Sequence, residues 1–466
     1  MGFRPSGLLQ SAHRMGDPVI LPRAEHVISR KQIDSDALKV LHRLHQNGYV
    51  AYLVGGSVRD LLLDRRPKDF DIGTSAHPYQ VKKAFRNCWI VGRRFRLAHV
   101  RFGTKNIEVA TFRRHVSADE VTPEAPPGDA VVPQALTPQD ASTLPIDTRE
   151  ATSQEGGHAD AHKRDRMIHR DNTFGTPEED AFRRDFTINA LFYNIADFSI
   201  IDFTGGLRDL EDKVVRCIGD PSERFQEDPV RMTRAVAMAA RLGFTIDPPV
   251  EAAIERHRHE IARSAPARLL DEFYKLLRTG AAERAFFMLA ERRLLEPITP
   301  SLQEQAGPAL WRSLAALDTY RARFGEAPDT LTNAVLLGTL LVPLGYTARS
   351  LASVPQKNGG RNGPQLSIGV LPLARRDVER LRQILTLQRG LLDIRLTPRA
   401  RLGLMHRSAF KDALTWLEIH GAAPEALEHW RGFIEAASTA APAADSTEEV
   451  PPSRRRRRRS RRRPSP

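Results

Sequence analysis

The chain has 466 residues, enough for roughly two to four domains, and its formal net charge is +13. Only two cysteines occur, Cys88 and Cys217, and neither belongs to a zinc-like cluster, so the sequence argues against a disulfide framework and a structural zinc. No apolar run is as long as a membrane span, and the N-terminus lacks a signal-peptide core. We therefore expect a cytoplasmic protein.

Most of the positive charge lies near the C-terminus, where nine arginines occupy positions 454–459 and 461–463. We expect 439–466 to be a disordered, arginine-rich tail, because Ala, Pro, Ser and acidic residues precede the arginines. Such a run predicts an anionic partner, most simply nucleic acid. It also leaves open a peripheral association with an anionic membrane surface.

After an N-terminus predicted to be disordered over 1–20, the first regular element is a helix over 34–47. Asp34 or Ser35 can cap its first turn, and apolar residues form one stripe along it. A strand over 49–54 then runs into a pair of glycines. Because Gly55 and Gly56 have no Cβ, the backbone there can turn tightly and present N–H groups to a phosphate.

The next predicted strand, 69–72, contains the sequence Asp69-Phe70-Asp71. Alternation along a strand puts both carboxylates on one face, roughly 6–7 Å apart at Cα, so that they can converge on a hard cation such as Mg²⁺. Asp-X-Asp alone also occurs in solvated turns. Its position after the glycine pair and Arg59-Asp60 favours a site for a metal-bound nucleotide.

The rest of this region completes a small α/β palm. Its predicted elements are a helix over 78–87 and strands over 89–91, 97–102 and 107–112. No aromatic residue occurs from 113 to 173, and the composition there is rich in Pro, Ala, Ser, Thr and acidic residues. We therefore expect a disordered insertion over 117–168.

Order is predicted to resume with a helix that Thr176 caps and Pro177 begins, followed by a hairpin over 191–195 and 200–202. Helical patterns then extend over 207–212, 229–242, 248–260, 266–278, 281–291, 309–323, 329–343, 375–389, 409–420 and 426–438, with a loop over 354–365. The predicted fold class is an α/β head with a small mixed sheet, followed by an all-α neck and body. We place the head at 21–206, the neck at 207–275 and the body at 276–438.

A site for a metal-bound nucleotide that contains Asp69 and Asp71 needs a third carboxylate from another part of the chain. Glu108, on a neighbouring predicted strand, is one candidate, although a solvent-facing strand carboxylate would look the same. Asp185 in the sequence RRDFTINA is the other, although a salt bridge with Arg183 or Arg184 would also explain it. The residues alone leave this choice open.

The segment 227–234, EDPVRMTR, predicts a helix with Asp228 as its N-cap and Pro229 in the first helical position. Asp228 and Arg231 then lie on one face and can offer an acceptor and donors to a base, while Arg234 can reach a phosphate. A capped helix with ordinary ion pairing is the simpler interpretation.

Four motifs together resemble those of the family of bacterial poly(A) polymerases and CCA-adding tRNA nucleotidyltransferases, which are polymerase-β-like: GGSVRD, KDFDIGTSA, RRDFTINA and EDPVR. The resemblance implies nucleotidyl transfer with two Mg²⁺ ions, metal binding by Asp69 and Asp71, and a functional role for Asp185. It also implies nucleotide binding by Gly55, Gly56, Arg59, Arg184, Asn189, Asp228, Arg231 and Arg234.

The sequence GRRFRLAHV separates the two activities of this family. Its arginines, Arg93, Arg94 and Arg96, can neutralise RNA or triphosphate charge, and its form resembles the poly(A) polymerase branch. That branch implies ATP as substrate, RNA 3′ ends as partners and mRNA polyadenylation that promotes RNA decay. The alternatives are a CCA-adding enzyme and a catalytically silent RNA-binding protein. The sequence names no protein partner.

Overall fold

The computed structural model describes residues 17–92, 96–114, 173–352 and 366–440. Several predictions concern segments outside this range: most of the N-terminus, the insertion over 117–168, the loop over 354–365, almost all of the tail, and Arg93 and Arg94. The chain divides into two compact units, Met1–Arg382 and Gln383–Pro466. No helix in the described part of the chain is both long and apolar enough to cross a membrane.

The head is built on an eight-stranded sheet with the order β1-β8-β7-β2-β3-β6-β5-β4. The strands are β1 Val19–Leu21, β2 Ala51–Val54, β3 Asp71–Thr74, β4 Cys88–Val91, β5 Leu97–Phe102, β6 Lys105–Thr111, β7 Leu191–Asn194 and β8 Ile200–Asp202. Strands β3 and β6 are parallel and the other neighbours are antiparallel. The predicted mixed sheet is therefore confirmed, including the β7–β8 hairpin, while β1 was not predicted.

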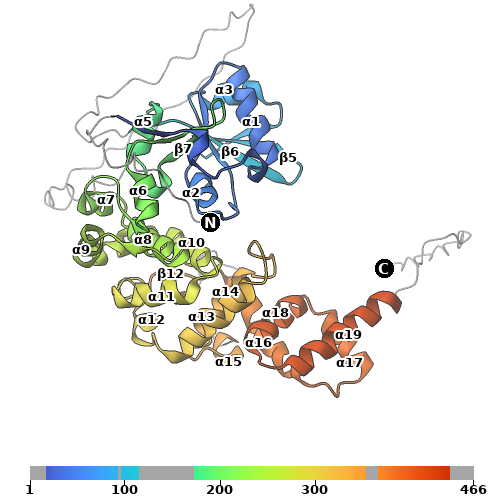
Figure 1. The fold of residues 1–466 in the computed structure, drawn as a ribbon. Coiled ribbons are helices and arrows are strands. Elements are labelled where there is room, and N and C mark those ends of the chain that lie inside the picture. Colours follow the sequence, from blue (N-terminus) through green and yellow to red (C-terminus); the bar gives the residue numbers. More distant parts are fainter. Residues whose placement is uncertain (1–16, 93–95, 115–172, 353–365, 441–466) are drawn as a thin grey trace, which may run out of the picture. The chain divides into compact units, whose positions relative to one another are not determined.

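The head also contains five α-helices (Figure 1). They are α1 Ser35–Gln46, α2 Gly56–Leu62, α3 Pro78–Ala84, α5 Pro177–Phe182 and α6 Gly206–Glu211. Asp34 caps α1, accepting the N–H groups of Asp36 and Ala37 over 2.9 and 3.2 Å. Thr176 caps α5 in a capping box with Glu179. Both caps were predicted, because each needs only residues adjacent in the sequence.

The prediction for β3 is shifted by two residues. The strand begins at Asp71 rather than Asp69, and Asp71 pairs with Val54, the last residue of β2. The chain turns into α2 at Gly55, so β2 offers no partner for Asp69. Asp69 therefore lies in the loop before the strand, and the same-face argument from strand alternation does not apply to the pair.

An aromatic cluster packs α5 and the following loop on the sheet. Its buried members include Val54, Phe112, Ala181 and Phe192. The ring of Phe192 meets those of Tyr52, Phe112 and Phe203 edge-on, with centroids 6.1, 6.3 and 5.7 Å away. This packing fixes the RRDFTINA segment against the end of β2.

Helices make up most of the remainder of the first unit: α7 Pro221–Glu227, α8 Val230–Leu242, α9 Pro248–His257, α10 Pro266–Leu277, α11 Ala282–Glu291, α12 Pro300–Glu304, α13 Pro308–Arg321, α14 Asn333–Leu341, α15 Ala348–Ala352 and the start of α16 Arg375–Leu392. Two short strand pairs interrupt them: β9 Val214–Val215 with β10 Thr245–Ile246, and β11 Ser367–Ile368 with β12 Leu371–Pro372. The sequence predicted neither pair, since two-residue strands carry no readable period.

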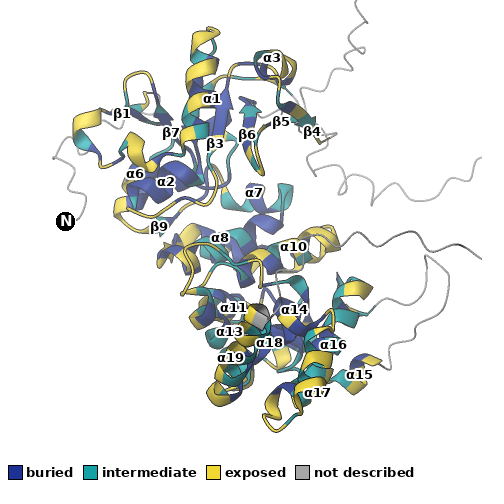
Figure 2. Cartoon of the chain, turned by 90° about the vertical axis from the view of Figure 1, so that its right-hand side faces the viewer, coloured by how far each residue is buried: buried dark blue, intermediate teal, exposed yellow. Residues whose placement is uncertain are grey.

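The second unit contains the end of α16, α17 Pro398–Met405, α18 Phe410–His420 and α19 Pro424–Ala440. Its centre is Trp430, which is fully buried and packs against the ring of Phe410 at 5.3 Å. The indole N–H of Trp430 donates to the carbonyl of Leu391 over 2.9 Å. Figure 2 shows the burial along both units.

Candidate active site

The Gly55–Gly56 pair forms the turn between β2 and α2. Gly55 has a φ of 73° and a ψ of −132°, a conformation that favours glycine. Its N–H donates to the carbonyl of Leu191 over 3.1 Å, so this N–H is used within the fold and is not offered to a phosphate, contrary to our expectation. A Cβ at Gly55 would lie 3.0 Å from Nη1 of Arg184, so the Arg184 guanidinium sits directly against the turn.

Arg184 is held in this position by two partners. Its Nε and Nη2 donate to Oδ2 of Asp180 over 3.2 and 2.8 Å, and its Nη1 donates to the carbonyl of Asn189 over 3.1 Å. Burial raises the pKa of the Asp180 carboxyl, but Arg184 and Arg183 outweigh burial and hold that pKa below its usual value. Asp180, which the sequence did not single out, thus positions the predicted nucleotide ligand Arg184.

The acids of the site lie on the other side of the turn. In the parallel register Ile72 pairs with Val109, which brings Asp71 level with Glu108 on the neighbouring strand β6. Neighbouring strands are about 4.8 Å apart, so these two carboxylates lie close on one sheet face. Asp69 lies in the loop before β3, where its side chain is largely exposed and its Oδ2 is 3.5 Å from Nζ of Lys68.

The electrostatics of Asp71 reflect this crowding. Burial is the largest cause of a raised pKa, and the charges of Glu108 and Asp69 raise it further, to about 6, while Arg184 lowers it. The site therefore carries excess negative charge, which a divalent cation would neutralise. In the described part of the chain, no three acidic, His or Cys side chains are already gathered closely enough to hold a metal ion.

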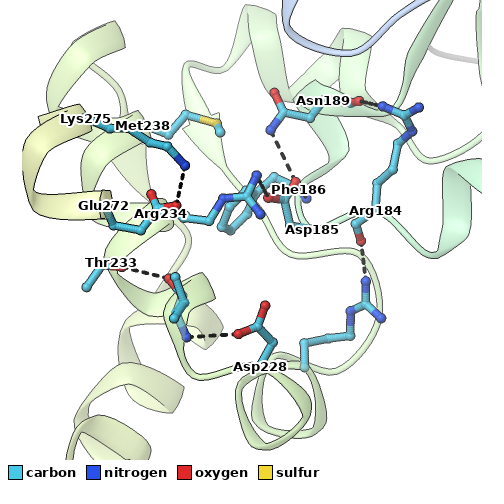
Figure 3. A network of polar contacts seen from close by, with 12 residues as sticks. Arg184, Asp185, Phe186, Asn189, Asp228, Thr233, Arg234, Met238, Glu272 and Lys275 are labelled. Carbon is cyan, nitrogen blue, oxygen red and sulfur yellow. Dashed lines mark hydrogen bonds and ion pairs between the residues drawn. The ribbon is translucent and has the colours of Figure 1, made fainter. Parts of the chain in front are cut away.

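Asp185 is placed differently from these acids. It is buried, its Oδ1 accepts the Phe186 N–H over 2.9 Å and the Asn189 side-chain amide over 3.2 Å, and its Oδ2 lies 2.7 Å from Nη2 of Arg234 (Figure 3). Burial raises its pKa, but the Arg234 charge and the Asn189 hydrogen bond prevail, so the pKa lies below the usual value. Of the two candidates for a third acid, Glu108 is therefore the neighbour of Asp71.

A closed polar circuit, which we call the neck circuit, continues from Asp185 and Arg234. Asn189 Oδ1 accepts from Nη1 of Arg59 over 2.5 Å, and Arg59 Nε and Nη2 donate to Oδ1 of Asp60 over 2.8 and 2.7 Å. Asp60 Oδ2 then accepts from Nη2 of Arg241 over 2.6 Å. Arg234 and Arg241 both belong to α8, so the circuit begins and ends on one helix.

The neck circuit gives the predicted residue Arg59 a structural position. Arg59 is buried, and its guanidinium donates to Asn189 and Asp60. The sequence did not assign a role to Asp60 or Arg241. No local pattern could have linked them, because they are far apart in the chain and meet only when α2 packs on α8.

The start of α8 follows the EDPVR prediction. Helix α7 ends at Glu227, and Pro229 already has helical dihedral angles, a φ of −60° and a ψ of −21°. Oδ1 of Asp228 accepts the N–H of Val230 over 3.3 Å, so Asp228 caps the helix as predicted. The Asp228 carboxylate also accepts hydrogen bonds from both terminal guanidinium nitrogens of Arg268, over 2.8 and 2.6 Å.

The two arginines of this segment, Arg231 and Arg234, differ in burial and in their partners. Arg231 is buried and donates to the carbonyl of Arg224 and to Glu227 Oε2, over 3.0 and 2.7 Å. Arg234 keeps two-fifths of its side chain exposed beside Asp185. Arg96, a predicted RNA contact, is exposed just before β5 with a φ of 39°.

Three family models match this chain. The Poly A polymerase head domain matches residues 51–216, the probable RNA and SrmB- binding site of polymerase A matches 243–305, and the polymerase A arginine-rich C-terminus matches 367–464.

Curated relatives named poly(A) polymerase I are also similar to this chain. Poly(A) polymerase I of Escherichia coli is 46% identical over 61% of this chain and 54% of its own length, and that of Haemophilus influenzae is 39% identical over 62% and 56%. The match thus spans little more than half of the length of these relatives. Among solved structures, the Bacillus stearothermophilus CCA-adding enzyme in complex with CTP has a TM-score of 0.58 at 25% identity, covering 87% of this chain and 83% of that one.

The neck circuit predicts that Asp60→Asn destabilises the protein. The change removes a buried carboxylate between Arg59 and Arg241 and leaves Arg59 without its charge partner, so the free energy of unfolding should fall by about 3 kcal/mol. Urea unfolding of the first unit measures this loss. Asp212→Asn is the matched control, because its pair with Arg208 is exposed and should change the free energy by less than about 0.5 kcal/mol. Equal stability of the two variants would contradict the circuit.

The crowded acids predict the opposite effect for Asp71→Asn. The raised pKa means that the ionised carboxylate destabilises the fold above pH 6, and that this cost fades as the pH falls from about 6 toward the unfolded value of 3.8. The variant should be more stable than the parent at pH 8 by about 1 kcal/mol, less than the full shift implies because the side chain reaches solvent, and the gap should close by pH 4. Thermal unfolding without metal measures the gap.

Glu108→Gln is the companion variant for this measurement. Removing its charge should lower the pKa of Asp71 and recover part of the same stability at pH 8. If neither variant is stabilised at pH 8, the two carboxylates do not repel each other as described.

Proposed function

Because this chain belongs to the family of bacterial poly(A) polymerases and CCA-adding tRNA nucleotidyltransferases, we propose that it is a polynucleotide adenylyltransferase. It transfers AMP from ATP to the 3′ hydroxyl of an RNA without a template and releases pyrophosphate. The observation that carries the proposal is the adjacency of Asp71 and Glu108 on one sheet face, beside a glycine turn that Arg184 covers. The similarity to the poly(A) polymerases I supports ATP over CTP.

Asp69 and Asp71, with Glu108 as a third ligand, would hold the metal, for which we propose magnesium because it prefers carboxylate oxygens. The raised pKa of Asp71 supports a cation at this place, since a cation would relieve the repulsion from Glu108 and Asp69. When bound, divalent ions activate the attacking hydroxyl and stabilise the pyrophosphate that leaves. Asp69 approaches from a loop, so its carboxylate can adjust to the ion while β3 and β6 hold Asp71 and Glu108.

The triphosphate of ATP lies against the glycine turn in this proposal. Arg184 and Arg234 supply positive charge there, and Asp185 with Asn189 orients both side chains. Gly56 lets the backbone approach the phosphates closely. Arg59 supports Asn189 from behind through the neck circuit.

For Asp228 and Arg231 the proposed role is recognition of the base of the nucleotide. Arg268 and Glu227 already occupy their main hydrogen-bonding atoms, so these residues would read a base only through the atoms left open. The RNA substrate is retained by Arg96 together with Arg93, Arg94 and the arginine-rich tail, which lie outside the described residues.

The product made from an unstructured oligoribonucleotide, given each nucleoside triphosphate separately with Mg²⁺, tests the proposed reaction. We expect long A tails from ATP and negligible incorporation from CTP. Asp69→Ala and Asp71→Ala should each reduce AMP incorporation by about 10³-fold, because each removes a metal ligand. Asp64→Asn, an exposed acid in the same stretch, is the matched control and should stay active. CMP incorporation restricted to tRNA ends would indicate a CCA-adding enzyme instead. If neither the oligoribonucleotide nor tRNA is extended, the chain is an RNA-binding protein without this activity.

A pair of conservative variants distinguishes the two candidates for the third acid. Glu108→Gln should lower kcat about 100-fold or more at saturating ATP and raise the Mg²⁺ requirement, since it removes a metal ligand. Asp185→Asn should mainly raise the KM for ATP, because it loosens Arg234. The reverse assignment, with the Mg²⁺ requirement changed by Asp185→Asn alone, would make Asp185 the ligand.

A further inference from the structure

One row of paired residues crosses the sheet from the acids to its edge. Glu108 on β6 pairs with His99 on β5, and His99 pairs with Trp89 on β4. His99 Nε2 also lies 3.7 Å from Oε1 of Glu108. Paired residues on neighbouring strands point to the same face, so Trp89 shares the face of the acids.

Trp89 is exposed on this face. Strand β4 ends the sheet, and 54% of Trp89 and 47% of Val91 are accessible to solvent, whereas Cys88 points to the opposite face and is buried. The exposed cation Arg101 follows two residues after His99 on β5 and therefore lies on the same face. Proteins that bind single-stranded nucleic acid combine such side chains, because a base can stack on the aromatic ring while the cation attracts the phosphate backbone.

The strand order also separates Trp89 from the nucleotide side of the site. Gly55 and its neighbour Arg184 lie at the end of β2, on one side of Asp71, while β6, β5 and β4 follow on the other side. Three strand spacings separate Trp89 from Asp71, about 14 Å. A base stacked on Trp89 therefore belongs to the RNA and not to the incoming ATP.

We propose that Trp89 is a stacking site for a base of the RNA substrate, a few nucleotides upstream of the 3′ end that meets the acids. This inference rests on the proposed function for the position of the 3′ end. It adds a binding residue on the edge strand, outside the sequence motifs that define the site.

Binding of a fluorescently labelled oligoadenylate of about twelve nucleotides, measured by anisotropy without ATP, tests the proposal, since sites on single strands span roughly 4–16 nucleotides. Trp89→Ala should weaken binding about tenfold, and Trp89→Phe should retain most of the affinity because a ring remains. Tyr79→Ala is the matched control: Tyr79 is 65% exposed on α3, away from the row, and its loss should leave the affinity unchanged. The thermal unfolding midpoints of all three variants should match the parent.

Kinetics separate this proposal from the proposed function. Trp89→Ala should raise the KM for RNA about tenfold and leave kcat and the KM for ATP unchanged. Unaltered RNA affinity in Trp89→Ala, or a raised KM for ATP alone, would overturn the stacking site while AMP transfer by the parent stands. If the parent binds oligoadenylate through Trp89 and yet transfers no AMP, the stacking site stands and the proposed function falls.

Discussion

The neck circuit is the interaction on which the candidate site depends. It is a chain of ion pairs and hydrogen bonds that joins helix α8 to the head at two points and runs through Arg234, Asp185, Asn189, Arg59, Asp60 and Arg241. Unpaired charges would be costly at the buried positions Asp185, Arg59 and Asp60, so each of these charges is held by its neighbours. The glycine turn, the RRDFTINA loop and the neck helix are consequently fixed relative to one another before any ligand binds, which is the preorganisation that transfer of a charged group requires.

The charges of Asp71 and Glu108, in contrast, are not balanced by neighbouring cations. Asp71 and Glu108 lie side by side on neighbouring strands, and the positive charge of Arg184 only partly offsets their repulsion. Ion-paired arginines and unbalanced carboxylates thus lie on either side of the glycine turn. In the proposed reaction a cation would balance the charge of the acids, and the triphosphate would lie between that cation and the arginines.

The sheet gives these parts their order in space. From β2 to β4 it carries in turn the glycine turn, the acids, a histidine and an exposed tryptophan. Strand spacing therefore sets the distance between the chemistry and the proposed RNA contact, and the edge strand can change its side chains without disturbing the acids. An edge position is where such variation costs the fold least, since only one side of the strand is paired.

The sequence by itself determined the features that depend on neighbours along the chain. The caps at Asp34 and Thr176, the β7–β8 hairpin and the mixed head sheet followed by helices were predicted because periodicity and capping act over a few residues. Only the tertiary structure decided where β3 begins, since that depends on where β2 ends, and how Asp228 is used, since its partner Arg268 lies on a later helix. It also showed that Glu108, and not Asp185, lies beside Asp71, because strand register is a long-range property that no local pattern records.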